Sequence, residues 1–184
     1  MKELTAQQHK RAESSGFIQR MLKRQMTDYE YYVFMSNQLM SYYVLEACAT
    51  KKGIFDGIEE VKRSLKIAQD VSEFEAEHGF KPIKPLKSTS KYMEYIENIS
   101  TDRDRLLAHI YVRHMGDLSG GQIIKRFVPG CGKFYEFETD VNELKEKLRA
   151  ILHDGLAEEA KVCFDMVTEF MEELEISIDM ESAN

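Results

Sequence analysis

Apolar residues recur every three or four positions along most of the chain, which is the spacing of one face of an α-helix. One clear case is the set Ile58, Val61, Leu65 and Ala68. The pattern predicts an all-α fold with helices over residues 5–25, 27–53, 58–78, 92–99, 101–127, 141–152 and 156–178. Because no internal repeat or linker is visible, we expect residues 1–184 to form a single compact multi-helix domain.

Two helix starts carry the capping-box signal, a Ser or Thr followed three residues later by Glu or Gln. Thr5 with Gln8 predicts the start of the first helix, and Thr27 with Glu30 predicts the start of the second. In such a box the threonine side chain and the Glu or Gln side chain each accept a hydrogen bond from a backbone N–H of the first turn. Both boxes are therefore expected to fix a helix N-terminus.

Glycine and proline mark where the predicted helices stop. Gly79 is expected to end the third helix, since glycine readily adopts the left-handed conformation at a helix C-terminus. Residues 80–90 are predicted to form a loop because Pro82 and Pro85 cannot continue a helix. Residues 133–140 are expected to be irregular or to form a short extended piece. The long fifth helix is ended by three further breakers, Pro129, Gly130 and Gly132.

Composition narrows the class of protein. The 184 residues are 43% hydrophobic and carry a net charge of −7, which argues against nucleic acid and anionic membranes as partners. No apolar run approaches the roughly 18 residues that span a bilayer, and the N-terminus lacks the apolar segment of a secretory signal. Cys48, Cys131 and Cys163 form no CxxC pair, so reduced thiols are expected. We therefore expect a soluble, cytoplasmic protein.

Three glycines interrupt the fifth helix in the segment GDLSGGQ, residues 116–122. LSGGQ is also the signature by which ABC-type ATPases contact nucleotide, but that function requires a GxxxxGK[ST] phosphate loop. The only Gly-Lys pair, Gly132-Lys133, is followed by Phe134 and has Phe127 five positions before its glycine. The predicted fold also lacks the alternating strands and helices of an α/β sheet. We therefore reject the nucleotide-binding interpretation.

The residues alone leave two interpretations of the glycines. Gly116 and Gly120 are four positions apart, so they share one helix face and form a smooth patch without side chains. Such a patch fits either close helix–helix packing or the close approach of a flat ligand. Asp117 lies between the two glycines, and Arg113 lies one turn earlier, within reach of an ion pair with Asp117.

Several segments resemble one family in the same order along the chain. YVRHMGDLSGGQIIKR resembles the distal helix of haem oxygenases, and HKRAESSGFIQRML resembles their proximal helix. SYYVLE is similar to the family's tyrosine-bearing second helix, and KFYEFETDVNELKEKLRAIL with LAEEAKVCF is similar to its propionate-binding and closing helices. The chain is identified as a member of the biliverdin-producing haem oxygenases, similar to the small soluble ones. The resemblance implies haem sandwiched between a proximal helix and a kinked distal helix.

The resemblance also implies roles for individual residues. His9 matches the axial iron ligand, and Glu13 matches a partner of its ring or is a solvated helix charge. Gly116 and Gly120 match the wall against the haem face. The edge that binds the two haem carboxylates is matched by Lys2, Tyr111, Lys145 and Arg149. The distal proton network is matched by Asp117, Tyr42 and Arg113.

Some residues fall outside this pattern or depart from it. The connection between Leu152 and Leu156 is shorter than is usual in the family, and Val167 stands where the family has an Asn. Neither change touches the matched iron ligand or the distal aspartate. The remaining histidines match no ligand position and are expected to be structural or on the surface: His78, His109, His114 and His153.

The resemblance implies that haem b is both cofactor and substrate. With O2 and electrons from an external reductant, the ring is opened at a meso carbon to give biliverdin, CO and ferrous iron. Ferredoxin is the expected donor, a flavoprotein reductase is the alternative, and a bilin reductase is a candidate partner downstream. The cluster Arg20, Lys23 and Arg24 is either a docking site for an acidic donor or a solvated face. Two rival functions are a haem-storage protein and a helical interaction module without haem.

Overall fold

The computed structural model describes residues 1–182, and the side chains of residues 1–178. Within these residues the chain forms helices and turns without a strand, which confirms the all-α prediction. Ala183 and Asn184, the last residues of the predicted domain, lie outside the described residues. The α-helices are α1 (Ala6–Glu13), α2 (Gly16–Leu22), α3 (Asp28–Lys51), α4 (Ser64–His78), α5 (Lys87–Asn98), α6 (Arg103–Ser119), α7 (Gly121–Ile124), α8 (Val141–Ala150) and α9 (Ala157–Ser182). The 3-10 turns are η1 (Glu3–Thr5), η2 (Glu59–Val61), η3 (Lys133–Tyr135) and η4 (Asp154–Leu156).

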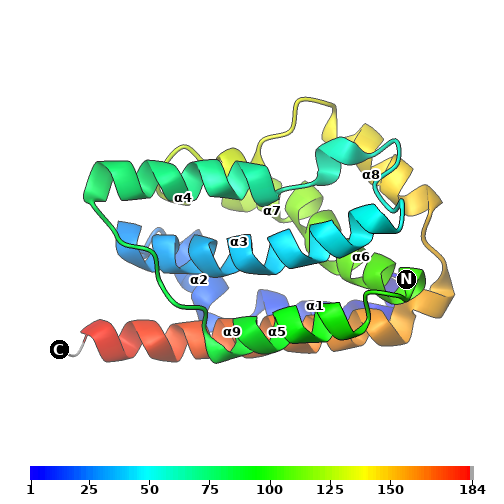
Figure 1. The fold of residues 1–184 in the computed structure, drawn as a ribbon. Helices are drawn as coiled ribbons and strands as arrows, with labels where there is room; N and C mark the ends of the chain where they lie inside the picture. The colour runs from blue at the N-terminus through cyan, green and yellow to red at the C-terminus, as the bar shows by residue number, and fades with distance from the viewer. Residues whose placement is uncertain (183–184) are drawn as a thin grey trace.

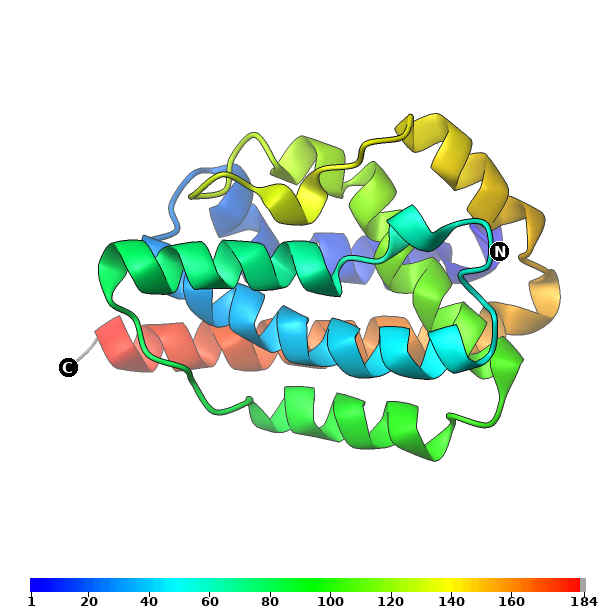
Figure 2. The same ribbon diagram turned by 45° about the horizontal axis from the view of Figure 1, so that its top comes forward.

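Two long helices organise the fold. α3 lies between α4 and α5 in Figure 1, and it also packs against α6. α9 packs against α1, α2, α5 and α6, so it joins the N-terminal helices to the glycine-containing helix. The N-terminus lies at the end of the molecule where α8 leads into α9, and the last described turn of α9 lies at the opposite end (Figure 2). None of the described helices combines the length and the apolar character needed to cross a membrane.

The capping box predicted at Thr27 is present at the start of α3. The Thr27 hydroxyl accepts a hydrogen bond from the backbone N–H of Glu30 at 3.2 Å, and the Glu30 carboxylate accepts one from the N–H of Thr27 at 2.7 Å. The box predicted at Thr5 is wrong. The chain already turns as η1 before this residue, so the buried Thr5 hydroxyl donates back to the carbonyl of Met1 at 3.1 Å.

We expect Thr27→Ala to lower the free energy of unfolding by about 1 kcal/mol, because the first turn of α3 loses its side-chain acceptor. Urea denaturation followed by circular dichroism measures the change. Thr27→Ser keeps the hydroxyl and serves as the matched control, with a stability close to that of the unsubstituted protein. Equal stability of all three proteins would contradict the contribution of the box.

The first predicted helix, residues 5–25, is broken into α1 and α2. The break falls at two serines, whose hydroxyls compete with helical hydrogen bonding. Ser14 donates its hydroxyl proton to the carbonyl of Arg11 at 2.9 Å, and Ser15 accepts from the N–H of Ile18 at 3.4 Å as the cap of α2. The predicted continuous proximal helix is therefore two short helices.

Among the remaining boundaries, three show the largest differences from the prediction. α4 begins at Ser64 rather than 58, after the turn η2, and α5 begins at Lys87 rather than 92. In both cases a carboxylate from a distant helix accepts the N–H groups of the first turn: Glu46 bonds to Ser64, and Glu173 bonds to Lys87. The long fifth helix ends at Ser119, and α7 follows it.

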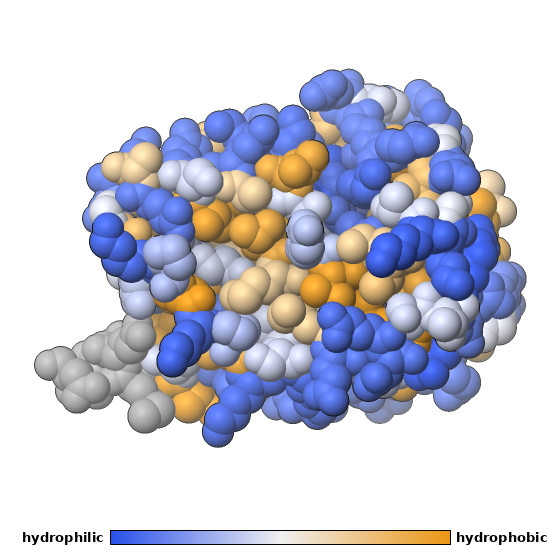
Figure 3. All heavy atoms as spheres, in the orientation of Figure 1, coloured by the Kyte–Doolittle hydropathy of each residue, from blue (hydrophilic) through white to orange (hydrophobic). Residues whose placement is uncertain are grey.

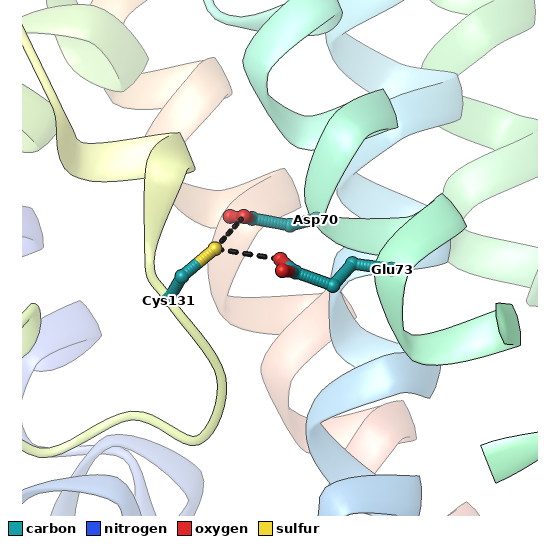
Figure 4. Close-up of side chains that lie close together, drawn as sticks. All are labelled: Asp70, Glu73 and Cys131. Atoms are coloured by element: carbon teal, nitrogen blue, oxygen red, sulfur yellow. Dashed lines mark hydrogen bonds between the residues drawn. The ribbon is translucent and has the colours of Figure 1, made fainter. Parts of the chain in front are cut away.

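A loop after α7 is fastened to α4 and positions η3. The Asp70 carboxylate accepts from the N–H of Lys133 at 3.0 Å and from that of Phe134 at 2.8 Å. The thiol of Cys131 points at Asp70 and Glu73 and donates to both, as Figure 4 shows. Burial, together with these carboxylates, raises the pKa of Cys131 to about 11, so the thiol keeps its proton near neutral pH.

The face shown in Figure 3 carries apolar side chains along its middle, over α3. Tyr43 of α3 is 65% exposed, and Leu65 of α4 is 80% exposed although the apolar spacing predicted it to be on an inner face. Exposed apolar side chains of this kind are common in folded proteins and do not by themselves mark a site. The candidate functional site is instead at the glycine-rich end of α6.

Candidate functional site

The three glycines at the end of α6 have different surroundings. A Cβ atom added at Gly116 would meet no heavy atom within 4 Å, and one added at Gly120 would meet only the Gly116 carbonyl oxygen at 3.7 Å. A Cβ atom at Gly121 would lie 2.7 Å from the ring of Tyr135, so this glycine is required for packing. The packing interpretation therefore holds for Gly121. Packing does not require glycine at Gly116 or Gly120, so the ligand interpretation remains for these two positions.

Asp117 lies beside this face but is itself buried, with 7% of its surface exposed. Tyr42 on α3 donates its hydroxyl proton to the Asp117 carboxylate at 2.8 Å, so the structure brings this predicted pair together. Burial raises the pKa of Asp117 to about 8, against the lowering effects of the Tyr42 hydrogen bond and of the charges on Arg63 and Arg113. A carboxyl group in this state exchanges its proton near neutral pH, as a general acid must.

The ion pair predicted between Arg113 and Asp117 is wrong. The Arg113 guanidinium instead donates to the side-chain oxygen of Gln38 at 2.9 Å and lies over the ring of Tyr92, with 4.0 Å to its centroid. Helix spacing permits contact one turn apart, but here the buried arginine turns toward α3 and α5, where an amide and an aromatic ring accept it. Arg113 still lowers the pKa of Asp117 through space.

His9 lies on α1, a helix that has no buried residue. The His9 side chain is 51% exposed, and its Nδ1 atom lies 3.3 Å from the Glu13 carboxylate. The His9 ring packs against the ring of Phe164 of α9 in a T-shaped arrangement, with 5.7 Å between ring centroids. Because Glu13 engages Nδ1, Nε2 is the nitrogen that remains for an iron atom, and a carboxylate on the other nitrogen orients such a ligand.

The predicted basic edge is spread over three elements. Lys145 is half-buried and Arg149 is exposed; their spacing of four residues places both on one face of α8. Tyr111 is half-buried on α6, and Lys2 is exposed just before η1. The neighbouring N-terminal amine pairs with Asp154 at 2.8 Å, which holds this end of the chain near the start of α9. Within the described side chains, no hydrogen bond or ion pair joins these four residues.

The histidines predicted to have no ligand role are distributed as expected. His109 and His114 are fully buried on α6, where their Nε2 atoms lie 3.0 Å from Glu159 and 2.9 Å from Glu46. His78 and His153 lie at the surface, with 32% and 52% of their side chains exposed.

Sequence reasoning missed a buried set of charged residues near Asp117. Glu46 on α3 is 4% exposed, and Arg63, just before α4, is 1% exposed. Glu46 lies in an otherwise apolar stretch, and this pattern indicates a buried carboxylate that needs a partner. Arg63 lies in the lysine-rich segment VKRSLK and carries no such sign.

Comparison with known proteins gives a consistent result. The family model described as "Heme oxygenase" matches residues 1–173. A haem oxygenase of Guillardia theta is 29% identical over 202 residues, covering 96% of this chain and 85% of that protein. Haem oxygenase 1 of Nostoc sp. is also 29% identical, covering 93% of this chain and 82% of that protein.

Two solved structures support the same conclusion. The haem oxygenase of Leptospira interrogans has a TM-score of 0.81 and 28% identity, covering 93% of this chain and 96% of that one. Haem oxygenase-2 of Synechocystis sp., solved with haem and NO, has a TM-score of 0.86 and 25% identity, covering 97% of this chain and 85% of that one. The chain belongs to the haem oxygenase family.

Proposed function

We propose that this chain opens haem between His9 on α1 and the Gly116–Gly120 face of α6, with Asp117 as the proton relay. The observation that carries the proposal is a buried, protonatable Asp117, bonded to Tyr42, directly beside a glycine face that is open to a flat ligand. Haem supplies the iron that binds O2 and the meso carbon that is oxidised, and the products are biliverdin, CO and ferrous iron.

The residues of the chain divide this work. His9 binds iron through Nε2, and Glu13 fixes the ring by engaging Nδ1. Gly116 and Gly120 admit the ring plane because no side chain stands there. Asp117 releases a proton toward the ligand through water and takes one back, while Tyr42 holds the carboxyl in place.

Lys145, Arg149, Lys2 and Tyr111 form the proposed binding edge for the two haem carboxylates. We expect Arg149→Ala to weaken haemin binding by about tenfold, the loss of one charge-assisted hydrogen bond at a partly exposed edge. Titration followed by haemin absorption measures this. Lys147→Ala on the same helix is the matched control, because Lys147 is paired with Glu143 at 2.7 Å. Equal loss in both variants would remove the edge assignment.

Haem oxygenases need an external electron donor, and we propose a ferredoxin, with a flavoprotein reductase as the alternative. An acidic donor fits the exposed cations Lys23 and Arg24 at the end of α2. Arg20 is less suited to docking, because its guanidinium bonds to the Glu30 carboxylate. Arg24 donates to the carbonyl of Arg126 at 3.0 Å, which places these cations beside the segment after α7.

Membership of the family favours ring opening over haem storage, and it leaves no role for a haem-free interaction module. The test is haemin reconstitution followed by addition of a reducing system under O2. Loss of the Soret band with growth of a biliverdin absorption is expected. A stable haem complex that turns over no haem would identify a storage protein instead.

A further inference from the structure

Asp117 belongs to a buried cluster of polar side chains from four elements, and each member is at most 7% exposed. The titratable and charged groups around the carboxyl group are Tyr42 and Glu46 of α3, Arg63 before α4, Arg113 and His114 of α6, and Tyr135 of η3. The only direct bond to the Asp117 carboxylate among the described residues is the one from Tyr42. The other groups act on it through space.

Arg63 is the least exposed cation of the cluster, at 1%. Its guanidinium donates to backbone carbonyls, at 3.2 Å to Val61 and 3.3 Å to Phe134, and also to those of Glu60 and Glu136. It stacks on the Phe137 ring at 3.8 Å. No carboxylate forms an ion pair with this guanidinium within the described part of the chain. A buried cation held only by carbonyls needs a nearby negative charge to offset the cost of desolvation.

Two carboxyl groups are available to offset it. The Glu46 carboxylate accepts the backbone N–H of Arg63 at 2.5 Å and also bonds to His114. Even so, Asp117 has the larger effect on the pKa of Arg63, which it raises against the lowering effect of burial. The effect is mutual, since Arg63 precedes Arg113 among the charges that lower the pKa of Asp117.

The net charge of the cluster depends on whether Asp117 is ionised. Arg63 and Arg113 stay positively charged over the whole pH range in which Asp117 titrates. Burial raises the pKa of Glu46, but the bonds from His114, Ser64 and the Arg63 N–H outweigh it and lower the pKa, so Glu46 is an anion. Burial lowers the pKa of His114, which favours the neutral ring. The cluster is therefore electrically balanced only when Asp117 is ionised.

We propose that Arg63 is a positioning residue for the reaction: its fixed, buried charge is the counter-charge against which Asp117 releases and regains its proton. The inference rests on the proposed relay role of Asp117. Asp117 loses one proton to water on the ligand side and takes one back from water, and Arg63 keeps its own protons throughout.

A purely structural role for Arg63 is the competing explanation, because the guanidinium ties η2 to η3. The direction in which the pKa of Asp117 shifts distinguishes the structural role of Arg63 from its electrostatic role. Removing a cation raises the proton affinity of Asp117, and removing the Glu46 anion lowers it, since Glu46 raises the pKa of Asp117. A loosened fold would not raise the pKa of Asp117 when Arg63 is replaced and lower it when Glu46 is replaced.

The experiment titrates Asp117 by carbon-13 NMR of its carboxyl group in the haem-free protein, with the signal assigned by its loss in Asp117→Asn. We expect Arg63→Gln to raise the midpoint by about one pH unit or more, Arg63→Lys to keep it, and Glu46→Gln to lower it. The alkaline limb of the pH profile for biliverdin formation should move with each midpoint.

The outcomes separate this inference from the proposed function. If Asp117 titrates near neutral pH but Arg63→Gln leaves its midpoint unchanged, the role of Arg63 is overturned and the relay stands. If Asp117 stays ionised across the range, the relay fails and the inference fails with it. If Arg63→Gln does not fold, Arg63→Lys decides: a retained midpoint supports the charge role, and a rise of one pH unit overturns it.

Discussion

Asp117→Ala is expected to bind haemin almost normally and to form biliverdin at least about 100-fold more slowly. Binding survives because the proposed contacts to haem come from His9 and the basic edge, which the substitution does not touch. Turnover suffers because the variant removes the only carboxyl group that is both buried beside the glycine face and bonded to Tyr42 among the described residues. Single-turnover absorption of the reconstituted protein with a reductase measures both quantities.

The matched control is Asp104→Ala, which removes an exposed carboxylate from the same helix. It should form biliverdin at the wild-type rate. Because burial raises the pKa of Asp117 to about 8, the wild-type rate should fall as pH rises through this value and the proton donor is lost. Wild-type turnover by Asp117→Ala would show that the relay lies elsewhere.

His9→Ala is expected to shift the Soret band and to weaken haemin binding by at least about 100-fold. The loss is expected to be larger than for a residue that only bonds to a metal ligand, because His9 is the proposed ligand itself. The Nε2 atom of His9 is the proposed iron ligand, and alanine offers no donor atom in its place. Absorption spectroscopy and haemin titration measure the change, and added imidazole should restore the band by occupying the vacated position.

His153→Ala is the control for this substitution, because its side chain is 52% exposed and that of His9 is 51% exposed. It should bind haemin as the unsubstituted protein does. An unchanged spectrum in His9→Ala would remove the ligand assignment, whereas equal losses in both variants would indicate a general effect of removing surface histidines.

The sequence predicted those parts of the fold that depend on neighbours in the chain. Helical periodicity located the helices, and the Thr27 box located the start of α3 because both partners lie within one turn. The starts of α4 and α5 were misplaced because Glu46 and Glu173 cap them from distant helices. Local patterns contain no information about such long-range caps.

In the candidate site, too, local features could be predicted from the sequence and long-range contacts could not. Gly116, Gly120 and Asp117 lie in one continuous motif, so their arrangement was readable from the sequence. The partner of Arg113 was not, because helix spacing offered Asp117 while the fold supplies Gln38 from another helix. Arg63 was missed because only the folded chain shows that the carbonyls after α7 surround it.

The short helix α1 carries the proposed iron ligand although it is weakly held by the rest of the chain. It has eight residues and none of them is buried, and a helix this short is marginally stable without outside contacts. Its contacts in this structure are mainly with α9. If His9 binds iron as proposed, haem adds a second anchor for α1, and part of the intrinsic haem affinity is used to order this helix. Haem affinity would then depend on how firmly α1 packs on α9, and not only on the residues that contact haem.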